Sequence, residues 1–450
     1  MPGPAGDSTP AVAVIGAGIV GASIALALRK RGAQVLLVDR DEPGRGCSSG
    51  NSGAISVSSV APLAMPGVLA SVPRMMLDDA SPLYLPWRYA PRALPWLARF
   101  VAAARPAVVQ ASAARLAALN AGALEAHEAM TRELGVPELF LRRGHLHLYP
   151  EESSLAKDAA GWRLREAAGH RVERLDRAGI EALEPAVSDR YRIGLFLAGH
   201  ATILDPLRYV QAMARAFAAA GGRIARAEVA GLAQRQGRWQ LRAAGAAQGR
   251  EFDHVVVAAG AWSGRLLAPL GVRLALESQR GYHVQFAGGR EAVSRTVVLA
   301  DRKVFVTPME EGLRIGGTVE IGGLAAPPDE RRAAVLARIA RESFRGLQDL
   351  PAQTWMGHRP CMPDSVPVIG PAPGHTGLWL ATGHGHLGLT QSLGTASRIA
   401  DALLGPCHCG SRPCVSGDFR AAGAGRVRSC FLRSWRPRPA GGPTALSRTD

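Results

Sequence analysis

The sequence predicts two interleaved domains: an α/β domain with a parallel sheet, discontinuous along the chain, and an inserted α+β domain with an antiparallel sheet. Three observations lead to this prediction. A complete βαβ pattern lies within residues 11–39, continuous apolar runs recur at 252–260 and 378–382, and residues 277–320 alternate with period two between glycine-rich turns. Continuous apolar runs are typical of parallel strands buried on both faces, and alternation is typical of antiparallel strands.

Length and composition fit this architecture. The 450 residues suffice for two or three cores, and 47% apolar with 20% charged residues is an ordinary globular composition. The net charge of +16 is almost entirely arginine, since lysine occurs only as Lys30, Lys157 and Lys303. These arginines are scattered through helical segments. A nucleic-acid partner would require basic residues clustered with aromatic ones, so none is expected.

The cysteines predict a reducing, cytoplasmic compartment. Cys47 and Cys361 are isolated, and the other four lie in the tail, where Cys407, Cys409 and Cys414 match no standard zinc spacing. No metal site is therefore expected. Residues 1–10 lack a basic stretch followed by an apolar run, and no apolar stretch is long enough to cross a bilayer, so neither a leader nor a spanning helix is expected.

The elements follow one another in a simple order. Expected strands are 11–15, 34–39, 142–149, 223–226, 252–260 and 378–382, and expected helices are 22–31, 106–134, 205–220, 331–347 and 389–404. We assign residues 11–65, 166–273 and 354–405 to the α/β domain, and 66–165 and 274–353 to the inserted domain. The composition of 1–10 and 406–450 predicts disorder.

The first βαβ unit carries a dinucleotide-binding motif. Gly16-x-Gly18-x-x-Gly21 lies between a buried strand and a helix, and Asp39 ends the next strand eighteen residues after Gly21. The glycines let the backbone approach a pyrophosphate at the helix N-terminus, and the aspartate can accept hydrogen bonds from a ribose. This context predicts a Rossmann-like domain, without distinguishing FAD from NAD.

A second ligand-binding segment follows at Gly46–Gly53, with the sequence GCSSGNSG. Small hydroxyl and amide side chains such as Ser48, Ser49 and Asn51 allow the chain to wrap an extended ligand, which bulky side chains would block. This segment favours a cofactor longer than a single nucleotide.

Taken together, the motifs resemble those of the FAD-dependent D-amino acid oxidase/dehydrogenase superfamily, nearest to its bacterial D-amino acid dehydrogenase branch. The resemblance covers residues 11–405 and includes, in order, Gly16–Gly21, Ser48–Gly53, Val255–Trp262, Arg280–His283, Gly357–Pro360 with Pro363–Gly370, and Thr382–Gly388. It implies a Rossmann-like FAD-binding domain, an antiparallel-sheet substrate domain, a bound flavin and oxidation of an amino or imino acid.

The resemblance also implies the residues that contact the cofactor. These are Gly16, Gly18, Ile19, Val20, Gly21, Asp39, Arg40, Ser48, Ser49, Asn51, Ser52, Gly53, Val229, Ala259, Gly260, Trp262, Gly385, His386, Leu387, Gly388, Leu389 and Thr390. The loop at 383–388 precedes a helix, so its free N–H groups can stabilise negative charge on a reduced flavin. His384 and His386 either reach the reacting centre or serve as structural hydrogen-bonding groups, and the sequence leaves both roles open.

The substrate residues implied by the resemblance begin with Arg359, whose guanidinium would hold the substrate carboxylate in a two-pronged contact. Tyr282, His283 and His386 are further catalytic candidates. Two departures from the family pattern bear on the substrate. The family often has a tyrosine just before Pro308, where this sequence reads Val304-Phe305-Val306-Thr307, and His386 replaces an arginine of the glycine-type oxidases.

The expected function is oxidation of a small amino acid, with a D-amino acid as the first expectation and a quinone or respiratory-chain component as electron acceptor. The alternatives are an oxygen-using oxidase of the glycine, sarcosine or proline type, and a flavin-binding protein without turnover. Residues 84–101 mix Trp, Leu and Arg, which indicates either peripheral contact with the cytoplasmic face of the inner membrane or, favoured by its prolines, packing between domains.

Overall fold

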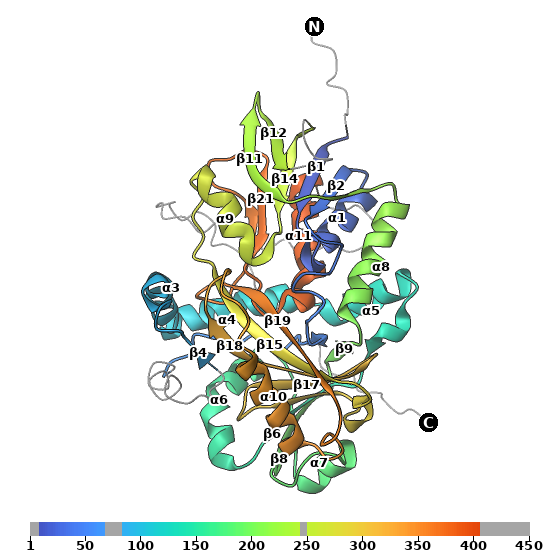
Figure 1. The fold of residues 1–450 in the computed structure, drawn as a ribbon, viewed down its shortest axis with the longest axis vertical. Coiled ribbons are helices and arrows are strands. Elements are labelled where there is room, and N and C mark those ends of the chain that lie inside the picture. The colour runs from blue at the N-terminus through green and yellow to red at the C-terminus, as the bar shows by residue number, and fades with distance from the viewer. Residues whose placement is uncertain (1–8, 68–82, 244–249, 406–450) are drawn as a thin grey trace, which may run out of the picture.

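The computed structural model describes residues 9–67, 83–243 and 250–405. It places a parallel-sheet unit above a larger, mainly antiparallel sheet, and the chain passes between them several times (Figure 1). The segments 1–8 and 406–450, and with them the expected disorder and the tail cysteines, lie outside the described residues.

The upper unit is built on a six-stranded sheet. In spatial order its strands are β10 (Arg223–Arg226), β2 (Gln34–Asp39), β1 (Ala11–Ile15), β14 (His254–Val257), β21 (Leu378–Thr382) and β20 (Val368–Pro371). The first five pair in parallel, and β20 pairs antiparallel with β21. All the expected strands except 142–149 thus meet in one sheet, which draws on the two ends and the middle of the chain.

Both faces of this sheet are covered, which explains its continuous apolar strands. Helices α1 (Ile19–Lys30), α8 (Pro206–Ala219) and α11 (Gly388–Leu404) share one core with it. A small antiparallel sheet of β11 (Val229–Arg235), β12 (Arg238–Ala243) and β13 (Glu251–Phe252) covers the other face.

The lower unit is a nine-stranded sheet. Its strand order is β19 (Ala352–Cys361), β15 (Glu277–Phe286), β18 (Gly312–Ile321), β17 (Val304–Met309), β16 (Thr296–Leu299), β6 (His145–Tyr149), β8 (Ile193–Leu197) and β7 (Glu173–Leu175), and β4 (Leu83–Tyr84) pairs with β18. Helix α10 (Glu330–Ser343) packs on one face through a shared apolar core.

Sheet membership differs from the expected boundaries in two places. Strands β7 and β8 fall within 166–273, and most of β19 falls within 354–405, yet all three pair within the nine-stranded sheet. The expected strand at 142–149 is also divided at Gly144, whose φ is +72°, so that only β6 joins the nine-stranded sheet. We therefore propose that the domain boundary be drawn by sheet membership.

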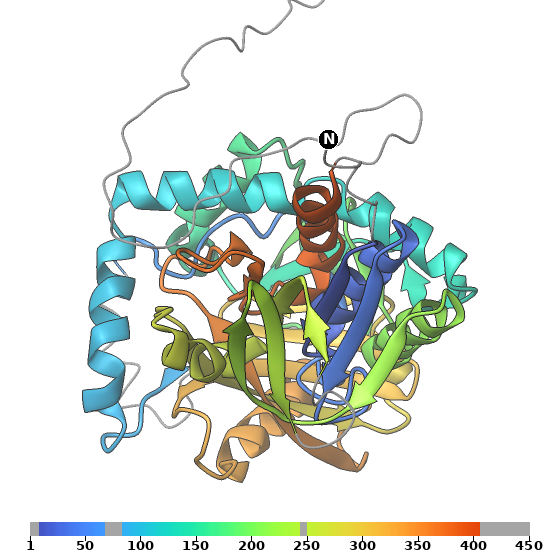
Figure 2. The ribbon, with the colours of Figure 1, turned by 90° about the horizontal axis from the view of Figure 1, so that it is seen from above.

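The remaining elements surround these two units (Figure 2). They are α3 (Ala90–Ala103), α4 (Pro106–Asn120), α5 (Ala123–Glu133), α6 (Glu152–Ala167), α7 (Arg177–Leu183), α9 (Ser263–Leu267) and a small sheet of β3 (Ala54–Ile55), β9 (Ala201–Ile203) and β5 (Phe140–Leu141). Within the described ranges, no helix has the length and apolar character needed to cross a membrane.

Candidate active site

The turn between β1 and α1 is built for close approach of a ligand. Gly16 has φ +104°, and a Cβ there would lie 2.4 Å from the carbonyl oxygen of Ala258. A Cβ at Gly21 would lie 1.8 Å from the carbonyl oxygen of Gly16, so this glycine brings the helix onto the turn. Helix α1 has no side-chain cap and no acidic residue in its first turn, which leaves a positive N-terminus for an anion.

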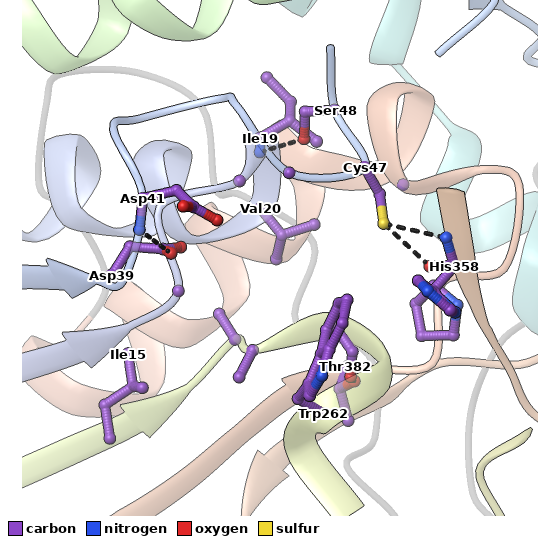
Figure 3. A pocket seen from close by; sticks show the side chains of 18 of the residues that line it. Ile15, Ile19, Val20, Asp39, Asp41, Cys47, Ser48, Trp262, His358 and Thr382 are labelled. Atoms are coloured by element: carbon purple, nitrogen blue, oxygen red, sulfur yellow. Dashed lines mark hydrogen bonds between the residues drawn. The ribbon is translucent and has the colours of Figure 1, made fainter. Parts of the chain in front are cut away.

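A cavity of about 410 Å³ extends from this turn to the edge of the nine-stranded sheet (Figure 3). Its lining includes many of the residues expected at the cofactor: Gly16, Gly18, Ile19, Val20, Asp39, Arg40, Ser48, Asn51, Val229, Ala259, Gly260, Trp262, Gly385, Gly388 and Leu389. Volumes of this order are typical of ligand sites. The sequence segments that carry the motifs are therefore brought to one cavity.

Asp39 and Ser48 order the two sides of the turn. The Asp39 carboxylate accepts hydrogen bonds from the backbone N–H groups of Ala17 (2.6 Å) and Asp41 (3.0 Å). The Ser48 hydroxyl accepts one from the N–H of Ile19 (2.9 Å), which ties the 46–53 segment to the start of α1. These contacts fix the backbone of the turn at the N-terminus of α1.

Several residues expected to touch the cofactor lie outside this cavity lining. Gly21 and Gly53 serve close packing, since a Cβ at Gly53 would lie 2.1 Å from the carbonyl oxygen of Ile203. Thr390 is buried, donates to the carbonyl of Ala54 and accepts from the N–H of Ser56. Ser49, Ser52, His386 and Leu387 are likewise not among the lining residues. Their contact with the cofactor stays a proposal.

The lining also includes residues that the sequence did not assign to the cofactor, among them Cys47 and His358. Cys47 lies with its Sγ 3.2 Å from both the backbone nitrogen and the carbonyl oxygen of His358. The His358 imidazole packs edge-on against Trp262, at 5.1 Å between ring centroids, and burial lowers its pKa to about 4. His358 directly precedes Arg359 in β19 and belongs to the same motif. Its place in that motif is the sequence feature that could have indicated a residue of the site.

The side chain of Arg359 extends from β19 across the backbone of Gly281 in the neighbouring strand. A Cβ at Gly281 would lie 2.2 Å from the guanidinium carbon, so this side chain lies flat across Gly281. Its Nη1 donates to the carbonyl of Thr318 at 2.8 Å, and Thr318 has a left-handed φ of +55°. Among the described residues, no carboxylate lies within ion-pair distance of Arg359, and burial lowers its pKa. The guanidinium is thus a desolvated cation without an anionic partner.

The two histidines of the 383–388 loop have different environments. His384 is buried, bonds Thr395 Oγ1 through Nε2 at 2.9 Å, and has a pKa lowered by burial to about 3. His386 is accessible to solvent, yet surrounding protein lowers its pKa to about 4, with the charge of Arg359 as a second cause. A side chain that is both accessible and desolvated lies in a cleft. His386 therefore lies near Arg359, whereas His384 lines the cofactor cavity with its ring held by Thr395, and its role there stays a proposal.

His283 connects the two units. Its Nδ1 lies 3.0 Å from the carbonyl oxygen of Gly50, and its ring stacks on Trp355 at 4.9 Å. Burial lowers its pKa to about 3, so the imidazole is neutral. His283 thus supports the 46–53 segment from the sheet below it.

Tyr282 requires a correction, because the structure places it away from the cavity. Alternation along β15 turns its side chain into the core beneath α10, where only 2% of it is exposed. The hydroxyl donates to Glu320 at 2.5 Å and accepts from the N–H of Asp329 at 2.9 Å, and burial raises the pKa of Tyr282 to about 12. Glu320 also pairs with the buried Arg280 at 2.8 Å. Tyr282 is part of a structural network.

Replacing Tyr282 by phenylalanine is therefore expected to lower the free energy of unfolding by about 1–3 kcal/mol, because Glu320 and the Asp329 N–H each lose a buried partner. Turnover should stay within about two-fold of the unaltered protein, since the hydroxyl does not reach the cavity. Urea unfolding and steady-state kinetics on the same preparation provide the measurements. A ten-fold fall in kcat/KM with unchanged stability would return Tyr282 to the substrate site.

Known proteins share this arrangement along almost the entire described chain. Residues 11–402 match the family model DAO, described as FAD dependent oxidoreductase. A protein of Bradyrhizobium diazoefficiens named D-amino-acid oxidase is 37% identical over 401 residues, which cover 88% of this chain and 95% of that protein. One of Dechloromonas aromatica named D-amino acid dehydrogenase is 32% identical, with 88% and 97% covered.

Solved structures agree on the fold. Glycine oxidase from Geobacillus kaustophilus superposes with a TM-score of 0.67 at 21% identity, covering 88% of this chain and 95% of that one. L-proline dehydrogenase from P. horikoshii gives 0.66 at 17% identity, with 88% and 94% covered. The glycine-rich turn, the start of α1 without an acidic residue and the shared cavity fit an extended dinucleotide such as FAD. The chain therefore belongs to the DAO family of FAD-dependent oxidoreductases.

Proposed function

We propose that this oxidoreductase removes the hydrogen on Cα of a D-amino acid as hydride while the amine loses a proton, so that the Cα–N bond becomes the C=N bond of an imino acid, which hydrolyses to a keto acid and ammonia. The observation that carries the proposal is the unpaired, desolvated guanidinium of Arg359 beside His386 at the edge of the cofactor cavity. A carboxylate is the anion that a guanidinium binds best in two-pronged geometry. Every α-amino acid carries one.

The other residues support this role by their charge. His386 is neutral near pH 7 because its pKa is about 4, so it adds a hydrogen-bonding group without repelling an ammonium or imine. FAD supplies the hydride acceptor when bound. Helix α11 begins at Gly388 with no side-chain cap and no acidic residue in its first turn, which places a positive helix end beside Gly385 and Leu389. No general base is required if the substrate amine is neutral.

The relatives support the stereochemistry and leave two acceptors to compare. Proteins at 31–34% identity are named D-amino acid dehydrogenase, which favours the D configuration and a quinone or respiratory-chain acceptor. The relative at 37% identity is named D-amino-acid oxidase, which favours molecular oxygen as the second candidate. We propose the quinone acceptor first, together with a peripheral contact of residues 84–101 with the membrane in which quinones dissolve.

Anaerobic bleaching of the flavin absorbance tests the substrate. Purified protein is mixed with D-alanine, L-alanine, glycine, sarcosine, D-proline or L-proline, and bleaching by the D-amino acids is the expected result. Bleaching by glycine, sarcosine or L-proline alone would replace the substrate assignment. A yellow protein that none of them bleaches would support a flavin-binding protein without turnover. Admitting air, or a soluble quinone without air, to the bleached protein then identifies the acceptor.

A further inference from the structure

The segment 84–101 presents an apolar stripe to solvent. Five large apolar side chains of the described residues are more than a third exposed, and three of them are Trp87 (76%), Leu94 (60%) and Val101 (36%). They are spaced by seven residues, and Leu94 and Val101 lie on α3. Seven residues are almost two full helical turns, so Leu94 and Val101 share one face of α3, and Trp87 lies in the turn that leads into the helix. We call Trp87, Leu94 and Val101 the apolar stripe.

Arginines accompany the apolar stripe along the chain. Arg88, Arg92, Arg99 and Arg105 are exposed, and no Asp or Glu occurs from Leu83 to Leu124. In the part of the chain that the structure describes, none of these four arginines forms an ion pair with a carboxylate. Arg88 lies over the Trp87 ring, 5.1 Å from its centroid. Elsewhere the exposed arginines commonly pair with carboxylates, as Arg132 and Arg142 do with Glu128.

The opposite face of α3 is firmly attached to the catalytic unit. Ala93, Trp96 and Ala103 are buried, and Ala93 and Trp96 pack with Ile321 and Cys361. The Trp96 indole donates to the carbonyl of Cys361 at 3.1 Å, two residues beyond Arg359. The backbone of Cys361 in turn forms an isolated antiparallel β-bridge with His384, in the loop before α11. The helix lies at the periphery of the molecule in both ribbon views (Figures 1 and 2), and its Trp96 meets the end of β19 at Cys361.

We propose that α3 and the residues before it form a docking surface for an anionic phospholipid bilayer. The apolar stripe enters the interface between headgroups and acyl chains, and the four arginines bind lipid phosphates while their stems lie along apolar surface. Domain packing, which the prolines had favoured, accounts only for the buried face of α3. The inference rests on the proposed quinone acceptor for its purpose, because docking here would bring the cofactor cavity close to an oxidant dissolved in the lipid.

Vesicle co-sedimentation of the flavin-loaded full-length protein tests the surface. Vesicles of phosphatidylcholine with one-third phosphatidylglycerol are compared with pure phosphatidylcholine, and binding is expected to the anionic vesicles and to weaken at high salt. The double variant Trp87→Ser/Leu94→Ser should bind about a hundred-fold more weakly, because two large apolar side chains no longer enter the interface. Each Arg→Gln change at Arg88, Arg92 or Arg99 should cost about five-fold.

The matched control is Ile224→Ser, which removes an apolar side chain of 41% exposure from β10 on the six-stranded sheet and should bind like the unaltered protein. Equal binding by the double variant and this control would overturn the proposal. So would sedimentation velocity showing a dimer that the double variant abolishes, since the stripe would then face a second copy. Bleaching in solution separates the two ideas: a protein that D-amino acids bleach but vesicles do not bind loses only the docking surface.

Discussion

Replacing Arg359 by alanine is expected to lower kcat/KM for a D-amino acid by about 10²–10³-fold while the protein keeps its flavin. Truncating one partner of a desolvated, hydrogen-bonded charge pair costs about 2–5 kcal/mol, and the carboxylate of a bound substrate would lose its only assigned cation. Arg359 is not among the residues that line the cofactor cavity, so flavin absorbance should persist. Steady-state kinetics with a soluble quinone gives the measurement.

A second readout without turnover distinguishes binding from chemistry. Benzoate carries a carboxylate but no oxidisable Cα–N bond, so its binding, followed by perturbation of the flavin spectrum, should be lost in Arg359→Ala. Arg359→Lys keeps the charge but not the planar fork and should fall between the two. Arg338→Ala, which removes an arginine of 59% side-chain exposure on α10, is the matched control. Unchanged kcat/KM and benzoate affinity in Arg359→Ala would contradict the carboxylate assignment.

Replacing Gly21 by alanine is expected to yield a protein without flavin. The added Cβ would lie 1.8 Å from the carbonyl oxygen of Gly16, and that atom belongs to the backbone, so α1 must move away from the turn. Overpacking of this kind costs about 1–3 kcal/mol of stability, and it moves the helix N-terminus that would face the pyrophosphate. The absorbance ratio of flavin to protein after purification, and titration of the apoprotein with FAD, measure the loss.

Gly264→Ala provides the comparison for Gly21→Ala. A Cβ at Gly264 would meet no atom within 4 Å, and this glycine lies in α9, where alanine is the better helix former. This variant should keep its flavin with equal or higher stability. If Gly21→Ala bound FAD as tightly as Gly264→Ala does, the close contact between α1 and the turn would not be needed for the site.

Local patterns predicted the parts of the fold that depend on neighbouring residues. The β1–α1–β2 unit, its three glycines and Asp39 lie within thirty residues of one another, and apolar runs identified β14 and β21. The pairing of strands that are far apart in the chain could not be predicted from the sequence in the same way. Strand β8 contacts β6 across more than forty residues, and nothing in its five residues selects between the two sheets.

For the site, too, short motifs identified residues, whereas the direction in which a side chain points depends on contacts with distant parts of the chain. Separate motifs in the sequence identified Gly16, Ser48, Gly260 and Gly385, and in the structure all four line one cavity. The face of Tyr282 could not be read from its motif, because alternation fixes which residues share a face without saying which face meets the core. A register shift between Arg280 and Tyr282 adds to that difficulty. His358 was missed because its neighbour Arg359 offered the clearer chemical role.

The walls of the cofactor cavity come from residues 15–51, 206–266 and 358–389. During synthesis the ribosome must therefore release almost the whole described chain before the final wall can form. A nascent or truncated chain that stops short of α11 gains none of the stabilisation that ligand binding confers on the folded state. Flavin uptake thus reports on completion of the polypeptide, and prematurely terminated products are left open to proteolysis.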